Sequence, residues 1–143
     1  MTFRSVLLAL TLTLALALAA GPGPPARAHH AFVMYDQSRT IALTGEVESF
    51  QLDNPHSRLT IAVLDRSNRV QTWLLEMGPT IVLTAGGWTA QTLARGDKVT
   101  VRLHPMRDGS HGGQFLGVQL PNGRSLTGGP KPSGGRGFDF EAR

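Results

Sequence analysis

Two adjacent histidines follow a hydrophobic leader at the start of the chain. His29 and His30 come directly after Ala26-Arg27-Ala28. If the chain is cut after Ala28, the free amine of His29, with a pKa near 8, and its own imidazole can chelate one metal ion. His30 would then offer a second mode, in which the amine, a backbone amide nitrogen and its imidazole bind together. Nitrogen ligands of this kind favour Cu(II), so the pair predicts a copper site.

Two further residues are candidates to complete such a site. His56 belongs to Asn54-Pro55-His56, which reads as a turn between two strands. Glu76 lies in an otherwise apolar strand, where a charged side chain needs a partner or a function. The predicted metal ligands are therefore His29, His30, His56 and Glu76.

Each of these residues also has a simpler interpretation. The two terminal histidines would be solvated if no metal binds them. His56 could cap its turn by hydrogen bonding. Glu76 could face solvent, or pair with Arg58 or Arg102 on a neighbouring strand.

A second, softer metal site is conceivable further along the chain. His104 and His111 flank one loop, and Met106 stands between them. Thioether and imidazole groups together suit a soft metal ion. A solvated loop is the simpler interpretation of the same residues.

The leader itself reads as a signal peptide over residues 1–28. A positive start at Arg4, an apolar run over Val6–Ala20 and alanines at the two positions that the cleaving peptidase reads occur in that order. The run is about 15 residues, against roughly 20 for a membrane span. We therefore expect a periplasmic or secreted protein with no stable membrane insertion after cleavage. A cut after Ala20 and an uncleaved anchor are the alternatives.

Composition narrows the possible partners. The chain has 143 residues, no cysteine, and 14 basic against 10 acidic side chains. Removal of residues 1–28 takes away two arginines and leaves a net charge of about +2. This balance and the expected export argue against a nucleic-acid partner. A protein or a small molecule, of unknown identity, is the expected partner.

Short alternating apolar segments predict a small β protein. The expected strands cover residues 41–52, 59–63, 70–77, 99–103 and 116–120. A bulge near Glu48 and Ser49 would account for a change of phase in the first strand. A hairpin turn at 65–68 and a short helix at 79–83 connect the following strands, and Gly112-Gly113 reads as loop.

These segments predict one all-β domain over residues 29–126. Five strands, with a helical connection between the third and fourth, suggest a small OB-like barrel; a partly open sandwich is the alternative. Residues 127–143 are rich in Gly and Pro, and we expect them to form a disordered tail.

Several motifs in this domain together resemble a known family. They are His29-His30-Ala31-Phe32, Tyr35-Asp36, Leu43-Thr44-Gly45-Glu46-Val47, Asn54-Pro55-His56, Trp73, Glu76-Met77-Gly78, Gly87-Trp88-Thr89, Gly96-Asp97, Asp108-Gly109-Ser110 and Leu120-Pro121-Asn122-Gly123-Arg124. This set is similar to a group of small exported bacterial proteins known only as a domain of unknown function. The resemblance covers essentially all of residues 29–126. It implies an exported, OB-like β domain with no assigned reaction.

Three functions remain open at this point. The first is copper binding by an exported, non-enzymatic protein, because no catalytic group is readable; Ser57 and Ser110 adjoin histidines, but adjacency does not make a nucleophile and base. The second is a metal-free adaptor or small-ligand-binding module, whose binding face would surround Phe50, Trp73 and Trp88. The third is a copper oxidase that uses the terminal chelate for oxygen chemistry.

Overall fold

The structure is a computed structural model that describes residues 32–129 of the chain. Strands dominate this part. In chain order the elements are the 3₁₀ turn η1 (Phe32–Met34), β1 (Ile41–Gln51), β2 (Arg58–Leu64), β3 (Val70–Glu76), the helix α2 (Thr80–Ala85), β4 (Lys98–Pro105), β5 (Gly112–Gln119) and β6 (Ser125–Thr127). Among the described residues no helix is long and apolar enough to cross a membrane.

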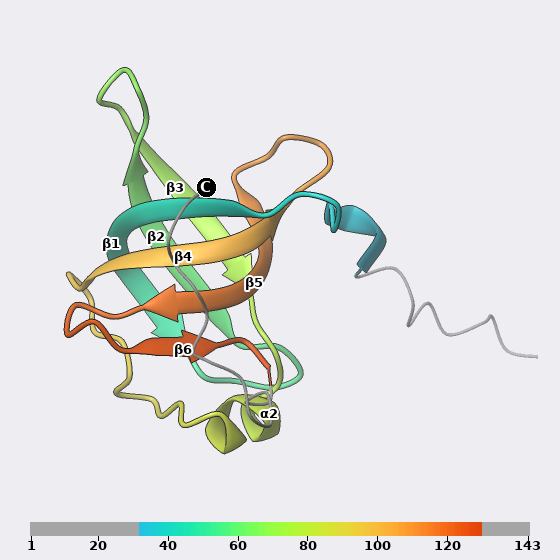
Figure 1. Cartoon of the computed structure of the whole chain (residues 1–143), viewed down its shortest axis with the longest axis vertical. Helices are drawn as coiled ribbons and strands as arrows, with labels where there is room; N and C mark the ends of the chain where they lie inside the picture. The colour runs from blue at the N-terminus through green and yellow to red at the C-terminus, as the bar shows by residue number, and fades with distance from the viewer. Residues whose placement is uncertain (1–31, 130–143) are drawn as a thin grey trace, which may run out of the picture. The chain divides into compact units, whose positions relative to one another are not determined.

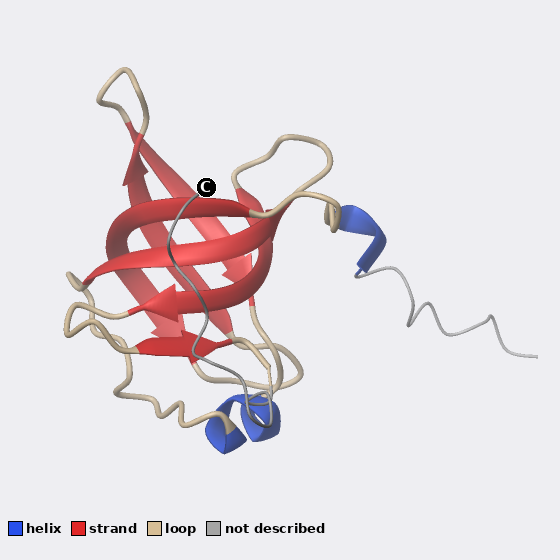
Figure 2. Cartoon of the chain, in the orientation of Figure 1, coloured by secondary structure: helices blue, strands red, loops and turns tan. Residues whose placement is uncertain are grey.

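Five of the strands close into a barrel. They are hydrogen-bonded in the order β3-β2-β1-β4-β5, with β6 added beyond β5, and a parallel pairing of β3 with β5 completes the circle. Figure 2 shows the strands curving round a common centre, with α2 at one end. The predicted all-β barrel, with a short helix between its third and fourth strands, is confirmed, whereas the partly open sandwich is not what forms.

The long first strand reaches two neighbours because it bends. Its first half pairs with β4 and its second half with β2. The register with β2 shifts between Val47 and Ser49, which confirms the predicted bulge at this point. Because an extra residue changes which side chains face inward, Val47 and then Phe50 both point toward the core.

The core fills the barrel and extends beneath α2. Leu59, Ile61, Leu75 and Leu103 are fully buried on the inward faces of the strands. Leu83 of α2 is also fully buried, so the short helix closes that end of the barrel (Figure 1). The helix covers Thr80–Ala85 between Pro79 and Gly86, so it begins one residue later and ends two residues later than the predicted 79–83.

The last strands differ from the prediction at two places. β5 begins at Gly112, so Gly112 and Gly113 are strand residues and the prediction of loop there is wrong. The β4–β5 register shifts between Arg102 and Leu103, and Phe115 of β5 is buried. At the other end β6 extends to Thr127, one residue beyond the expected domain end at 126. The predicted leader and residues 130–143 of the predicted tail lie outside the described residues.

Candidate functional site

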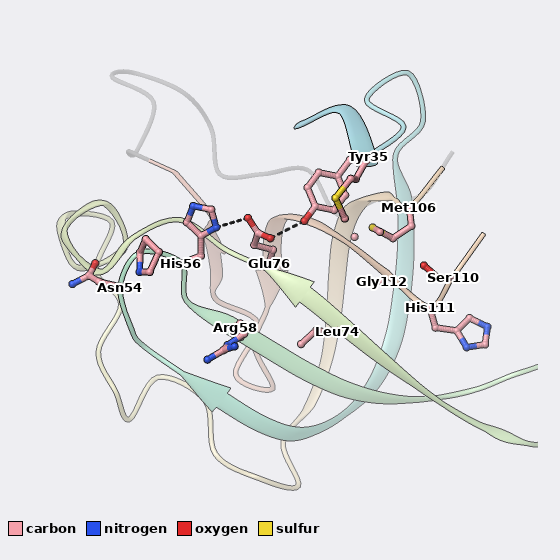
Figure 3. A pocket seen from close by; sticks show the side chains of 13 residues that line it. Tyr35, Asn54, His56, Arg58, Leu74, Glu76, Met106, Ser110, His111 and Gly112 are labelled. Carbon is pink, nitrogen blue, oxygen red and sulfur yellow. Dashed lines mark hydrogen bonds and ion pairs between the residues drawn. The ribbon is translucent and has the colours of Figure 1, made fainter. Parts of the chain in front are cut away.

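Three side chains meet where η1, the β1–β2 turn and the end of β3 come together. The Nδ1 atom of His56 lies 2.5 Å from Oε1 of Glu76. The hydroxyl of Tyr35 donates a hydrogen bond of 2.9 Å to the other carboxylate oxygen, Oε2. Figure 3 shows the histidine and the tyrosine approaching Glu76 from opposite sides. One carboxylate thus holds both groups, and we call His56, Glu76 and Tyr35 the triad.

The β1–β2 turn fixes His56 because its neighbour is pinned to β3. Ser57 is fully buried. Its amide donates to the carbonyl of Gly78, and its carbonyl accepts from the amide of Met77. Its hydroxyl exchanges hydrogen bonds with the backbone of Asp53 at 3.1 Å. Ser57 therefore closes the turn through Asp53 and ties it to the segment directly after β3, which brings His56 beside the last residue of that strand.

Tyr35 is held by the end of β4. It forms an isolated antiparallel bridge with Met106, and the amide of Asp36 donates to the carbonyl of Pro105 at 2.8 Å. The Nε atom of Arg107 donates to the carbonyl of Tyr35 at 3.1 Å. Only 4% of Tyr35 is exposed. The segment after η1 is thereby fastened to the barrel with its phenol directed at Glu76.

A cavity of about 460 Å³ opens beside the triad. This volume lies within the range of small-ligand sites, roughly 300–1,000 Å³. Its lining combines the triad with further side chains that can bind metals or hydrogen-bond, among them Met34, Met106, Ser110 and His111. Nitrogen, oxygen and thioether donors therefore share one concave surface.

The pKa of Tyr35 is raised well above its ordinary value. Burial is the largest cause, and the hydrogen bond to Glu76 and the negative charge of that carboxylate act in the same direction. Since folding favours the protonated phenol, Tyr35 contributes stability at any pH below the ordinary tyrosine value of about 10. That contribution is lost as the pH rises above this value toward the folded-state pKa.

The raised pKa of Tyr35 can be measured by titrating tyrosine absorbance against pH, because Tyr35 is the only tyrosine in the chain. Tyrosinate absorbance should appear at higher pH in the folded protein than in the urea-unfolded protein. Glu76→Gln should move the folded curve back toward the unfolded one, because it removes the negative charge. Tyr35→Phe supplies the baseline. Coincident folded and unfolded curves would contradict the hydrogen bond as described.

The structure brings together two of the four predicted metal ligands. His56 and Glu76 are in contact, whereas His29 and His30 lie outside the described residues. Arg58 is the cross-strand neighbour of Glu76 in the register of β2 and β3. The carboxylate nevertheless contacts His56 and Tyr35 rather than Arg58. Within residues 32–129 no three His, Asp or Glu side chains are grouped closely enough to hold a metal ion.

The softer site suggested by three residues of the β4–β5 region is only partly assembled. Met106 and His111 line the cavity, but His104 does not. The Nδ1 atom of His104 lies 2.7 Å from the carbonyl of Arg39 instead. Strand alternation alone would put His104 and Met106 on the same face, so the contact of His104 with Arg39, and not the strand period, accounts for its place outside the cavity lining.

Trp88 cannot take part in a partner-binding face, and that prediction needs correction. Its exposed fraction is 1%, and its ring packs between Phe50 and Phe115. Phe50 and Trp73 are only partly buried and pack against the core. The turn glycines before Trp88 fold its ring back into the barrel, which periodicity does not reveal.

Sequence reasoning missed Tyr35 and Met34 as cavity residues. Tyr35 is the only tyrosine in the chain and precedes an aspartate that fixes its turn, because the Asp36 carboxylate accepts from Ser38 at 2.6 Å. The single tyrosine followed by a turn-forming aspartate is the sequence feature that could have identified Tyr35. The two serines beside histidines are also accounted for, since the Ser110 hydroxyl donates to Asp108 at 2.6 Å and Ser57 bonds the turn.

Comparisons with known proteins give a family and no function. No curated protein and no solved structure matches the chain. The model of a family of unknown function, DUF6152, matches residues 17–115, a stretch that contains the triad and both N-terminal histidines. This match covers more than half of the sequence, and the chain therefore belongs to the DUF6152 family.

Proposed function

We propose that this protein is exported and binds a transition-metal ion, copper in preference to others, through histidine nitrogen. The observation that carries the proposal is the contact between Nδ1 of His56 and Glu76. A ring nitrogen that donates to a carboxylate leaves the second nitrogen, Nε2, with its lone pair free. Metal-binding histidines characteristically have this arrangement, because the carboxylate orients the ring and raises its basicity.

The remaining members of the triad support the same role. Tyr35 occupies the second oxygen of Glu76, so the carboxylate is held from both sides and the histidine ring has a fixed partner. The His56 side chain is 46% exposed, so its free nitrogen has access to solvent and to an incoming ion. Glu76 thus acts on the metal through His56 and is a positioning residue rather than the direct ligand expected from the sequence.

The N-terminal histidines are a separate donor group in this proposal. Cleavage after Ala28 would create an amine and two imidazoles within two residues. Such a group binds Cu(II) by itself, because nitrogen donors suit that ion. Its existence depends on export and on the position of the cut, so it is tested separately from His56.

A copper titration of the mature protein tests the proposal. The protein is purified from an exporting host, its intact mass is measured, and Cu(II) affinity is determined by competition with a chelator. We expect a mass that begins at His29. Glu76→Gln should weaken binding about 10- to 100-fold, the range found when such outer partners are removed. His56→Ala removes the ligand itself and should weaken binding at least as much. His29→Ala should weaken the terminal chelate.

His104→Ala is the matched control, because His104 is a barrel histidine that does not line the cavity. If His56→Ala and His104→Ala bind Cu(II) equally well, the role of His56 is wrong. A mass that begins at Gly21 would remove the terminal chelate from the proposal. Affinity no better than that of a generic histidine peptide would contradict metal binding altogether.

The cavity itself favours a second candidate function, a metal-free small-ligand or adaptor module. Its volume of about 460 Å³ is enough for a small organic molecule. Melting the protein with copper and with a chelator separates the two functions, since any ion bound only by the folded state raises the melting temperature. Equal melting temperatures would favour the metal-free module.

A further inference from the structure

Two methionine thioethers line the same cavity as the triad. They belong to Met34 in η1 and Met106 after β4. Met34 is 49% exposed, which is unusual for a side chain that serves only to fill a core. By contrast Met77 is 3% exposed and belongs to the core cluster. Met77 therefore belongs to the core, whereas Met34 is accessible at the cavity.

The backbone fixes both methionines to one end of the barrel. The bridge between Tyr35 and Met106 places their segments side by side, and the amide of Arg107 donates to the carbonyl of Met34 at 2.9 Å. The amide of Met106 donates to the carbonyl of Gly112 at 3.0 Å. The two thioethers are thus carried by segments that hydrogen bonds hold together rather than by free loops.

Gly112 leaves room for Met106 at the cavity wall. A Cβ atom at Gly112 would lie 3.3 Å from Cγ of Met106 and 3.1 Å from the carbonyl oxygen of Leu74. Both contacts are tighter than ordinary packing allows. Because position 112 carries no side chain, the methionine can lie against the β3–β5 junction and face the cavity.

An imidazole stands at the rim of this surface. His111 lines the cavity, and its ring centroid lies 5.1 Å from that of Trp73, with the ring planes tilted by 32°. Its carbonyl accepts from the amide of Leu74 at 3.2 Å, so the backbone at this position is tied to β3. Figure 3 shows His111 and Met106 on the same side of the cavity, away from His56, with the His111 ring directed away from Met106, so this ring must rotate off Trp73 to share a ligand with the thioethers.

We infer that Met34, Met106 and His111 form a site for monovalent copper. Thioether ligands are soft and select Cu(I), whereas the hard and intermediate divalent ions prefer oxygen and nitrogen. The chain has no cysteine, so methionine is its only soft donor. The site goes beyond the proposed function, because it differs from it in residues, in donor type and in oxidation state. No redox step is involved, since copper would be bound as Cu(I).

A Cu(I) competition assay on the whole mature protein tests the inference. The assay is run without oxygen, with a coloured Cu(I)-specific chelator as the competing probe. The double variant Met34→Leu/Met106→Leu removes both thioethers and nearly conserves side-chain volume, so the fold should survive with little loss. We expect Cu(I) affinity to fall at least about tenfold, or about 1.4 kcal/mol. His111→Ala should weaken it similarly.

Met77→Leu is the matched control, because it makes the same chemical change at a methionine outside this cavity. X-ray absorption of the Cu(I)-loaded protein should show sulfur scattering that the double variant lacks. If the double variant binds Cu(I) as tightly as Met77→Leu does, the site is wrong. If only His111→Ala is without effect, the three-donor set is wrong.

The Cu(I) and Cu(II) assays test the two proposed sites independently. The methionine variant should leave Cu(II) affinity unchanged, and His56→Ala should leave Cu(I) affinity unchanged. Loss of Cu(I) binding on His56→Ala alone would overturn the thioether site and leave the proposed function standing. If His56→Ala leaves Cu(II) affinity unchanged while the methionine variant loses Cu(I) binding, the role of His56 is wrong and the thioether site stands.

Discussion

Trp88→Ala is expected to destabilise the barrel by about 3–5 kcal/mol, the range for removal of a large aromatic side chain from a core. The ring is 1% exposed, and its centroid lies 5.4 Å from Phe50 and 5.6 Å from Phe115. Its Nε1 atom also donates a hydrogen bond of 2.8 Å to the carbonyl of Thr127. The substitution would therefore leave a cavity and an unsatisfied acceptor at β6.

This loss is large because small domains have a stability of only about 5–15 kcal/mol. Urea unfolding followed by circular dichroism measures it, since Trp73 remains in both proteins and complicates fluorescence. Trp73→Ala is the comparison, because Trp73 is only partly buried and should cost less. A loss below about 1 kcal/mol at Trp88 would be incompatible with a ring enclosed on all sides.

Gly113→Ala is expected to destabilise the barrel where β3, β4 and β5 meet. A Cβ atom there would lie 2.3 Å from Cδ1 of Leu103 and 2.5 Å from the backbone oxygen of His104. The leucine can rotate, but the carbonyl belongs to β4, which pairs with β5 at this position. Leu75 of β3 pairs with the same glycine, so the clash falls where the barrel closes.

We expect a loss of about 3 kcal/mol, at the upper end for overpacking, because backbone rather than a side chain must move. Gly129→Ala is the matched control, since a Cβ atom there meets nothing within 4 Å. Thermal unfolding of the two variants beside the parent protein measures the difference. Equal melting temperatures for the two variants would mean that β3 and β5 do not approach as closely as described.

The elements of the fold were largely predictable because they depend on local properties. Alternation at 59–63 and 70–77 predicted β2 and β3, and the change of phase after Val47 predicted the bulge. Turn residues likewise predicted the hairpin between β2 and β3, where the Asp65 carboxylate accepts hydrogen bonds from the amides of Ser67 and Arg69. Each of these patterns lies within about ten residues, and backbone preference and side-chain period fix it.

The closure and the site were less predictable because they join distant segments. The β3–β5 pairing brings residues 74–76 beside 112–114. Because these strands are parallel, no hairpin turn joins them, and the turn residues of the sequence cannot predict the pairing. Gly112 and Gly113 read as loop because glycine weakens isolated strands, yet close approach at the junction requires them there. The sequence alone predicts Trp88 on a binding face, because no neighbouring residue indicates that its turn folds inward.

By itself the sequence determined the five barrel strands in outline, the bulge, the short helix, the family resemblance, and His56 and Glu76 as candidate metal-binding residues. The signal peptide remains a prediction, and so does the metal chelate that His29 and His30 would form at a mature N-terminus. Only the tertiary structure decided that Glu76 contacts His56 and Tyr35 instead of its cross-strand neighbour Arg58, and that two methionines share their cavity. The physical reason is range: period and turn chemistry act between neighbours, whereas the partners of Glu76 come from segments that meet only when the barrel closes.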